Sequence, residues 1–398
     1  MAETIAARPP RPPFWRNERF RRVVGQVVFA ILVVVVGREL FLNLEFNSAA
    51  QGEKLGFDFL KVQAGFEIGD TPIEYSPNDA ISRGILAGYL NTLRVSLLGI
   101  VLASILGLVV GVARLSTNWM LRKVAQVYVE LIRNTPVPLQ VVFWWGAVFL
   151  TIASIGNSLS VFDLAFLSNR GLVISWLRLE EGAASWGLML LAGLIVGAVL
   201  WRWRTRHNER TSEPHHRVLY ALGAILAFGI VGYLLTGTPT TANVPKLTET
   251  SFGFDFVGGV TFTPEFAALL LALVIYTAAF IAEIIRGSIQ AVPKGQREAA
   301  ESLGLSRFEQ LRFVILPQAL RIAIPAINSQ YLNLLKNSSL GVLISFYELN
   351  RVIRSVSTQK GYVASAYLMA LLLYLGTCLV ISFLMNLLNR AVTSKGVR

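Results

Sequence analysis

Long apolar runs separated by short polar segments dominate the chain. Several runs contain roughly 20 residues, the length at which an α-helix crosses a hydrocarbon layer of about 30 Å. The runs lack the apolar/polar alternation of barrel strands, so we consider only helices as spanning elements. The pattern predicts an all-α polytopic membrane bundle of eight transmembrane helices, at 23–42, 86–113, 137–155, 184–201, 218–236, 265–285, 322–347 and 363–388.

Composition supports the membrane interpretation. The 398 residues are 54% hydrophobic and 15% charged, with a mean hydropathy of +0.56. A soluble domain carries about 25% charged residues, so a soluble globular protein is excluded. The one cysteine, Cys378, lies in an apolar run, which excludes a disulfide framework and a cysteine metal cluster. Because His207, His215 and His216 share one polar segment, we interpret that segment as a solvated basic loop rather than a metal site.

The formal net charge of +12 predicts topology. In a soluble protein this charge would favour nucleic acid as a partner. Here the basic residues gather in alternate polar segments, namely the N-terminal arm 1–22, then 114–133, 202–217, 286–321 and the tail 391–398. The positive-inside rule places these segments, and with them both termini, in the cytoplasm. We therefore expect a multi-pass membrane protein, with membrane lipid and no nucleic acid as a partner.

The first span follows a basic arm, as the apolar part of a signal peptide does. Arg38 and Glu39 separate this run from the small residues 48–50. The distance between the run and these small residues is long for cleavage by signal peptidase. We therefore predict an extra N-terminal transmembrane helix at 23–42 that stays uncleaved. The periplasmic loop at 43–85 follows it and is rich in acidic residues.

The polar segment 287–321 is more ordered than a simple connector needs to be. Pro293 suits a helix start, where its missing N–H removes a group that would have no partner. Residues 296–303 form a short predicted helix, and Gly304 suits the left-handed residue that ends it. The segment thus begins with one short helix and a glycine elbow.

A second short helix is predicted directly after the elbow. Ser306 and Glu309 have the spacing of a capping box, which opens a helix. Phe308, Leu311 and Val314 would share one face of this helix. We expect the helix to end before Pro317, because a proline disfavours helical backbone in the residue that precedes it.

The first of these helices has the features of a docking surface. Ala299 and Ala300 leave room for a close approach, and Glu298 offers a charge beside them. A pair of interfacial helices that only cover the end of the bundle is an alternative interpretation. A DNA-binding helix-turn-helix is disfavoured, since two nearby membrane spans would keep it out of a major groove.

The residues of this segment resemble the EAA motif of ABC importer permeases. Glu298, Ala299, Ala300 and Gly304 are followed by nine residues and then by the run Val314, Ile315, Leu316, Pro317. The usual pattern has isoleucine where this chain has Val314. The resemblance implies that a cytoplasmic coupling helix docks on an ATPase subunit, with Glu298, Ala299, Ala300, Gly304, Leu316 and Pro317 as its motif residues.

Four further stretches resemble the polar amino-acid permeases of the histidine/glutamine type. They are residues 89–93, 130–136, 282–287 leading into 292–296, and 336–340. Asn134 stands where that family usually has glycine, and Ser338 where it usually has threonine. The extra N-terminal span and a long insertion make the layout similar to the larger permease subunit of general L-amino acid importers, the AapQ/BztB-like type.

The resemblance implies a five-helix type I importer core with additional helices, located in the bacterial inner membrane. The core comprises 86–155 and 265–390, and the insertion 156–264 carries two transmembrane helices. The family implies four kinds of partner: a second homologous permease subunit, two ATP-binding subunits, a periplasmic amino-acid-binding protein and membrane lipid. The acidic loop 43–85 would contact the binding protein or form a solvated cap, and the sequence leaves both open.

The chain itself has no phosphate-binding loop of the GxxxxGK[ST] pattern. We therefore expect a non-catalytic translocation subunit without a cofactor of its own, with ATP and Mg²⁺ on the partner ATPase subunits. An ion-gradient-driven secondary transporter with Glu283 as its proton site is an alternative, and a non-transporting membrane scaffold is another. The two-helix segment favours the importer over both.

Ionisable residues within spans are candidates for the substrate path, because leaving them unpaired in hydrocarbon costs at least about 2.5–3.5 kcal/mol. Glu283 can pair with Arg286 three residues later, as a structural pair or as part of the path. Lys336, with Asn337 and Ser338, would accept a substrate carboxylate or satisfy carbonyls freed by Pro325. Near the outer end of its span, Arg94 is expected to extend toward the interface.

Overall fold

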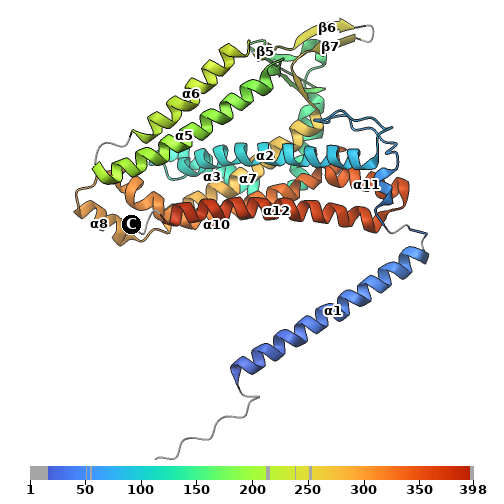
Figure 1. Cartoon of the computed structure of the whole chain (residues 1–398), viewed down its shortest axis with the longest axis horizontal. Coiled ribbons are helices and arrows are strands. Elements are labelled where there is room, and N and C mark those ends of the chain that lie inside the picture. The colour runs from blue at the N-terminus through green and yellow to red at the C-terminus, as the bar shows by residue number, and fades with distance from the viewer. Residues whose placement is uncertain are drawn as a thin grey trace, which may run out of the picture. The chain divides into compact units, whose positions relative to one another are not determined.

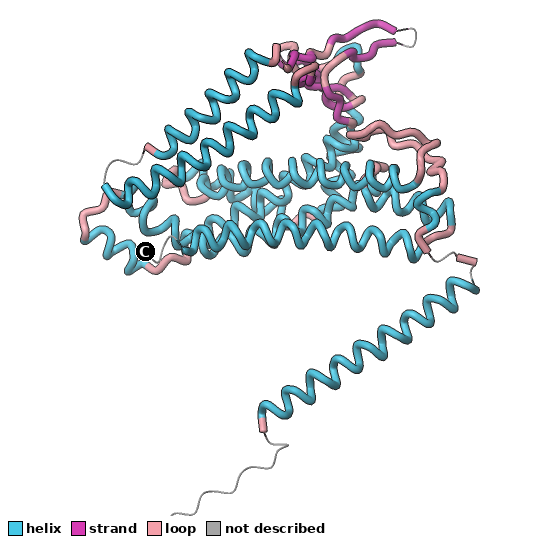
Figure 2. Tube along the Cα trace, in the orientation of Figure 1, coloured by secondary structure: helices cyan, strands magenta, loops and turns pink. Residues whose placement is uncertain are grey.

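The computed structural model describes residues 17–50, 52–53, 56–211, 216–237, 239–250 and 253–394. Most of the arm predicted at 1–22, the last residues of the tail 391–398 and His215 therefore lie outside the described residues. Figures 1 and 2 show that long helices dominate the described chain, as the sequence predicts. Within it, seven helical segments are long and apolar enough to cross a membrane: Glu18–Ala50, Ile81–Ala113, Ala183–His207, Arg217–Leu235, Pro264–Gln290, Arg307–Ile344 and Val363–Val392.

The span expected at 137–155 is shorter than predicted. It consists of α4 (Val137–Phe143), a π-helix (Trp144–Val148) and a 3-10 turn (Phe149–Thr151). Pro136 caps α4, and extended backbone at Ile152 ends the turn. The indole N–H of Trp145 lies 3.2 Å from a carboxylate oxygen of Glu265. This polar contact fixes the π-helical part against the first turn of α7 (Pro264–Gln290).

The described chain divides into two compact units. One contains the residues up to Asn91 and Tyr347–Val380, and the other contains Thr92–Phe346 and the residues from Ile381 onward. The first unit includes α1 (Glu18–Ala50), the start of α2 (Ile81–Ala113), α11 (Leu349–Lys360) and most of α12 (Val363–Ser394). Ser48 is the one buried residue of α1, so nearly the whole apolar surface of that helix is available to lipid.

The loop predicted at 43–85 is folded over much of its length. It contains the end of α1, the 3-10 turn Asp58–Lys61 and a β-bridge between Gln63 and Ala80. Phe59 and Phe66 are buried in one apolar cluster with Ile85 of α2 and Ile353 of α11. A solvated acidic loop would not bury these rings, so this part of the chain has a core of its own.

Asn91, in the motif at 89–93, ties this unit together. Its side-chain amide donates to the carbonyl oxygens of Asp70, at 2.6 Å, and Tyr347, at 3.0 Å. Both acceptors are backbone atoms of segments far away in the sequence. A single amide in an otherwise apolar helix thus satisfies two loop carbonyls.

Glu348 is a buried carboxylate that the sequence did not single out. It caps α11 by accepting from the backbone N–H groups of Asn350 and Arg351, each at 2.8 Å, and from the Tyr374 hydroxyl at 2.9 Å. Its side chain is fully buried. Burial raises the pKa of Glu348 from its ordinary value near 4.5 to about 7, although the three hydrogen bonds and Arg351 oppose that shift.

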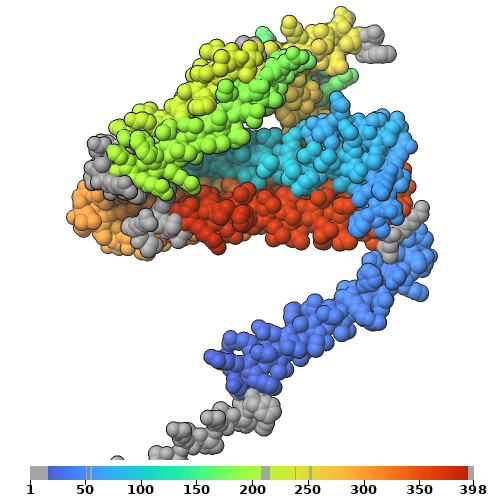
Figure 3. Space-filling model, in the orientation of Figure 1, coloured from blue at the N-terminus to red at the C-terminus, as the bar shows by residue number. Residues whose placement is uncertain are grey.

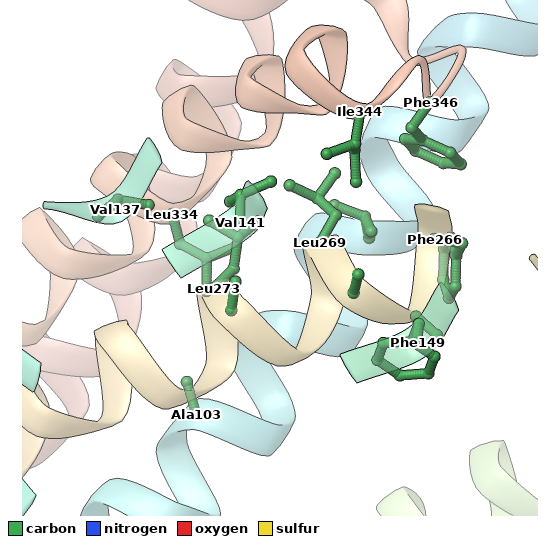
Figure 4. Packing of buried hydrophobic residues seen from close by; sticks show 14 of the residues in the cluster. Ala103, Val137, Val141, Phe149, Phe266, Leu269, Leu273, Leu334, Ile344 and Phe346 are labelled. Carbon is green, nitrogen blue, oxygen red and sulfur yellow. The ribbon is translucent and has the colours of Figure 1, made fainter. Parts of the chain in front are cut away.

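The second unit is built around α7. Its core contains Leu269 and Leu273 of α7, Val141 of α4, Leu334 of α10 (Leu316–Asn337) and Ile344 of the 3-10 helix Ser338–Ile344. Figure 4 shows Leu269 and Val141 pointing toward one another, with Ile344 beside them. Side chains from segments up to two hundred residues apart therefore pack on one helix.

Glycines let α2 approach its neighbours closely, as expected for membrane helices. A Cβ at Gly107 would lie 2.7 Å from Ile281 of α7, and one at Gly111 would lie 3.1 Å from the Ala282 carbonyl. At Gly99 the nearest atom would be 3.1 Å away, on Leu334 of α10. Close packing thus joins α2 to both α7 and α10.

Arg94 does not extend toward the interface. Its guanidinium carbon lies 4.2 Å from the ring centre of Phe266 and 5.6 Å from that of Phe262. The aromatic faces at the start of α7 attract the cation, which stays against the protein instead of reaching outward.

The insertion contains the two predicted helices, α5 (Ala183–Thr211) and α6 (Arg217–Leu235). They pack along one another, as Figure 3 also shows. Small residues again permit the contact, since a Cβ at Gly193 or Gly232 would lie 2.8 Å from the opposite helix.

Short strands around these helices were not predicted. Strands β1 (Leu159–Val161), β2 (Ala165–Ser168), β3 (Gly171–Ile174) and β8 (Val260–Phe262) form one antiparallel sheet, and β8 leads into α7. Two antiparallel strand pairs accompany it: β4 (Trp176–Leu179) with β5 (Thr240–Asn243), and the hairpin of β6 (Lys246–Thr250) with β7 (Gly253–Val257). The prediction considered helices alone, and strands of three to five residues give too little periodicity to detect.

We expect Glu348 to make the stability of the protein depend on pH. Because its folded-state pKa of about 7 exceeds the ordinary value near 4.5, the folded state binds the proton more tightly than the unfolded state. The contribution of this group to stability should therefore fall as pH rises from about 4.5 to 7 and stay level above that.

The measurement is the thermal unfolding midpoint of the purified protein between pH 5 and pH 8. Glu348→Gln cannot titrate, so the difference in midpoint between wild type and variant should change over this range, in favour of the variant at high pH. Glu249→Gln, on an exposed strand, is the control. A constant difference between wild type and Glu348→Gln would contradict the prediction.

Candidate coupling segment and translocation path

The segment that follows α7 forms two helical pieces around a glycine, as predicted. Helix α8 (Lys294–Ser302) is capped by Pro293, and Gly304 has a left-handed φ of +73°. The Gly304 N–H donates to the Glu301 carbonyl at 2.9 Å, and the Leu305 N–H donates to the Ala300 carbonyl at 3.2 Å. These bonds end α8 at the elbow.

The second piece begins at the predicted capping box. Ser306 caps α9 (Arg307–Glu309): its hydroxyl accepts from the Glu309 N–H, and the Glu309 carboxylate accepts from the Ser306 N–H. The prediction that this helix ends before Pro317 is wrong. Helix α9 continues through a π-helix (Gln310–Ile315) into α10, which begins at Leu316.

The π-helix explains how the chain passes Pro317. Proline lacks an N–H, and its ring would clash with the carbonyl four residues earlier in a regular α-helix. The Leu316 N–H donates instead to the Leu311 carbonyl, five residues back, which widens the turn ahead of the proline. Leu316 and Pro317 therefore lie inside a continuous helix that leads from the elbow into a spanning segment.

The base of the segment is fixed to the helices on either side of it. Val292, Ile315 and Ala319 are buried together, with Ile289 of α7 packed against them. The Arg297 guanidinium of α8 donates to the Ile289 carbonyl at 2.9 Å. Helix α8 is therefore joined to the last turn of α7 and to the first turn of α10.

The motif residues of α8 divide between its two faces. Ala300 is 2% exposed and packs at the base, whereas Glu298 and Ala299 are exposed. Leu303 and Phe308 flank the elbow and are 79% and 66% exposed. Figure 1 shows α8 beyond the ends of α7 and α10. The outer face thus offers a carboxylate and apolar side chains to another surface.

A polar stripe runs along α10. Ser329, Asn333 and Lys336 are exposed and follow at intervals of four and three residues, which places them on one face of the helix. Asn337 is partly buried. Ser338 is fully buried, and its hydroxyl donates to the Leu335 carbonyl at 2.6 Å. Sequence reasoning found Lys336 and Asn337 but missed Ser329 and Asn333, whose helical spacing from Lys336 was the available signal.

Glu283 lies in a cluster of charges at the end of α7 that leads to α8. One carboxylate oxygen is 2.5 Å from Arg286, which confirms the predicted pair. Arg114, the residue after α2, also binds this carboxylate. The structure therefore groups Glu283 with two arginines. Glu283 lies on α7 and is not part of the polar stripe on α10.

Comparison with known proteins agrees with this arrangement. Residues 218–394 match the family model described as "Binding-protein-dependent transport system inner membrane component". The putative amino-acid ABC transporter permease YhdX of Escherichia coli is 41% identical over 94% of this chain and 95% of its own length. The general L-amino acid transport system permease AapQ of Rhizobium johnstonii is 37% identical, over 94% of this chain and 92% of its own.

A third relative extends the match to nearly the whole chain. The glutamate/glutamine/aspartate/asparagine transport system permease BztB of Rhodobacter capsulatus is 34% identical over 98% of this chain and 99% of its own length. The similarity thus includes the N-terminal span and the insertion as well as the coupling segment. The chain belongs to the family of binding-protein-dependent inner membrane components, the permeases of ABC transporters.

Proposed function

We propose that this permease carries L-amino acids into the cell as half of the translocation path of an ATP-driven importer. The observation that carries the proposal is the match, over more than nine-tenths of the chain, to permeases named for amino-acid transport. The second half of the path is a homologous permease subunit. A periplasmic amino-acid-binding protein delivers the substrate, and two ATP-binding subunits hold the ATP and Mg²⁺.

The orientation follows from the charge distribution. The coupling segment and both termini face the cytoplasm, where the basic residues gather. The strands around α5 and α6 then face the periplasm, because they adjoin the opposite end of α7 from α8.

Within this chain, the coupling step uses the contacts that α8 already makes with α7 and α10. An ATPase subunit binds the outer face with Glu298, Ala299 and Leu303, and ATP binding or hydrolysis changes the position of that face. The cluster around Ile289 and Ile315 transmits this change to α7 and α10. The ATPase contacts can shift the equilibrium between the two states of the bundle only by as much as their free energies differ between those states.

The polar stripe on α10 supports a role in substrate passage. A Lys336 ammonium facing lipid would cost at least about 2.5–3.5 kcal/mol, so a protein-lined or aqueous surface suits it better. Ser329 and Asn333 lie on the same face. The Lys336 ammonium attracts the carboxylate of an amino acid. The neutral side chains of Ser329 and Asn333 beside it let the substrate pass without being held.

Uptake into proteoliposomes tests the function. The chain is purified with its co-expressed neighbours, and labelled amino acids are offered with and without internal ATP and external binding protein. Uptake that requires both supports the importer, and competing amino acids define its range. Uptake by the chain alone, driven by a pH gradient without ATP, would contradict the proposal.

We predict that Gly304→Asp and Glu298→Lys uncouple the transporter. The first places a side chain at a φ of +73°, and the second reverses a charge on the docking face. Membrane insertion should remain normal, while the ATPase subunits dissociate during purification and uptake falls at least tenfold. Glu249→Lys, an exposed charge reversal on β6, should change nothing. Normal uptake by both coupling variants would refute the docking role.

Substitution of Lys336 should slow transport without disturbing assembly. Lys336→Gln removes the charge offered to the carboxylate, so uptake at saturating binding protein should fall at least tenfold, and Lys336→Arg should keep more activity. Lys246→Gln, an exposed lysine on β6, is the matched control. Equal uptake by wild type and Lys336→Gln would remove this residue from the path.

A further inference from the structure

The carboxylate of Glu283 joins two helices that are far apart in the sequence. It binds Arg286 one turn later on α7, with Nη2–Oε1 at 2.5 Å and Nε–Oε2 at 3.2 Å. It also binds Arg114, which directly follows the last residue of α2. The side chains of Arg114, Glu283 and Arg286 are 13%, 26% and 28% exposed. Partial burial makes these contacts stronger than surface ion pairs, which contribute little.

The two arginines have different structural consequences. Arg286 lies on the same helix as Glu283, so their pair leaves the position of α7 relative to other helices undetermined. Arg114 belongs to the end of α2, and its pair with Glu283 is the ionic link between the two helices at this end. Glycine packing reinforces it nearby, where Gly107 and Gly111 bring α2 onto Ile281 and Ala282.

The same turn of α7 continues into the coupling segment. Arg286 also donates to Gln290, the last residue of α7, and Arg297 of α8 donates to the Ile289 carbonyl. Polar contacts thus join α8 to Ile289, and Gln290, the next residue of α7, to Arg286 and Glu283. From Glu283 the contact with Arg114 leads to the end of α2.

We propose that Glu283 is a positioning residue that carries the movement of the coupling segment to α2 through its bond to Arg114. This inference rests on the proposed function, because it concerns how ATP-driven movement of α8 reaches the path. In this proposal Glu283 acts through its bonds to two arginines of the same chain. Its effect is to make α2 follow α7, so that both helices change position when α8 does.

The test uses the whole complex in lipid nanodiscs or proteoliposomes. The measured quantity is the number of amino acids transported per ATP hydrolysed. Arg114→Gln and Glu283→Gln should lower this ratio at least tenfold, while ATP hydrolysis stays within twofold of wild type and the subunits copurify. Arg114→Lys keeps a charge at the position and should retain a larger ratio than Arg114→Gln.

Arg122→Gln is the matched control. Arg122 lies on the neighbouring helix α3 (Trp119–Arg133), is exposed and bonds the Ser116 carbonyl at 2.9 Å, so its loss should leave the ratio unchanged. An unchanged ratio in Arg114→Gln would overturn the inference. A second result would also overturn it: Glu283→Gln loses assembly, hydrolysis and transport together, while Arg114→Gln keeps a normal ratio. Glu283 would then have a purely structural role.

The outcome is separable from that of the proposed function. If the wild-type complex does not link ATP hydrolysis to amino-acid uptake, the proposed function fails, and Glu283 has no movement to carry. If the wild type does so and the variants keep its ratio, only the inference about Glu283 fails.

Discussion

Hydrocarbon cannot satisfy a polar group, and the architecture depends on that constraint. Backbone groups in the spans bond within helices, and where a proline interrupts the ladder the chain widens into a π-helix before Pro317. Charged side chains that approach the spans find partners in the protein: Arg94 lies on aromatic rings, and Glu283 lies between two arginines. The same constraint applies to Lys336, whose exposed position on α10 indicates a surface other than lipid.

The same constraint explains why α7 is the central helix. In the most apolar stretch of α7, 56% of the residues are buried, compared with 33% in α2 and none in α1. A helix that touches so many others can transmit a displacement to all of them, and α8 is joined to its last turn. The additional helices α1, α5 and α6 bury little of their most apolar stretches. They enlarge the permease without altering the connection between α8, α7 and α10.

Sequence reasoning succeeded where one local rule acted alone. Local patterns reveal the left-handed backbone at Gly304 and the capping box of Ser306 with Glu309. They also reveal the close helix contacts at the glycines of α2. It failed where two rules competed. At Pro317 the bias against helix before proline was overridden by the continuity of two flanking helices, and a π-turn absorbed the conflict. Glu348 and the bond from Arg114 to Glu283 depend on tertiary contacts across 26 and 169 residues, which no local pattern contains.

The exposed polar stripe also bears on the proposed second permease subunit. Ser329, Asn333 and Lys336 face outward from one face of α10. Only water or another protein can lie against such a face at low cost. A path for a zwitterion needs polar groups on all sides, and the stripe on α10 would provide them on one side. A second permease that presents a comparable face would complete the path, and the boundary between the two subunits would then be the place where the coupling helices act on it.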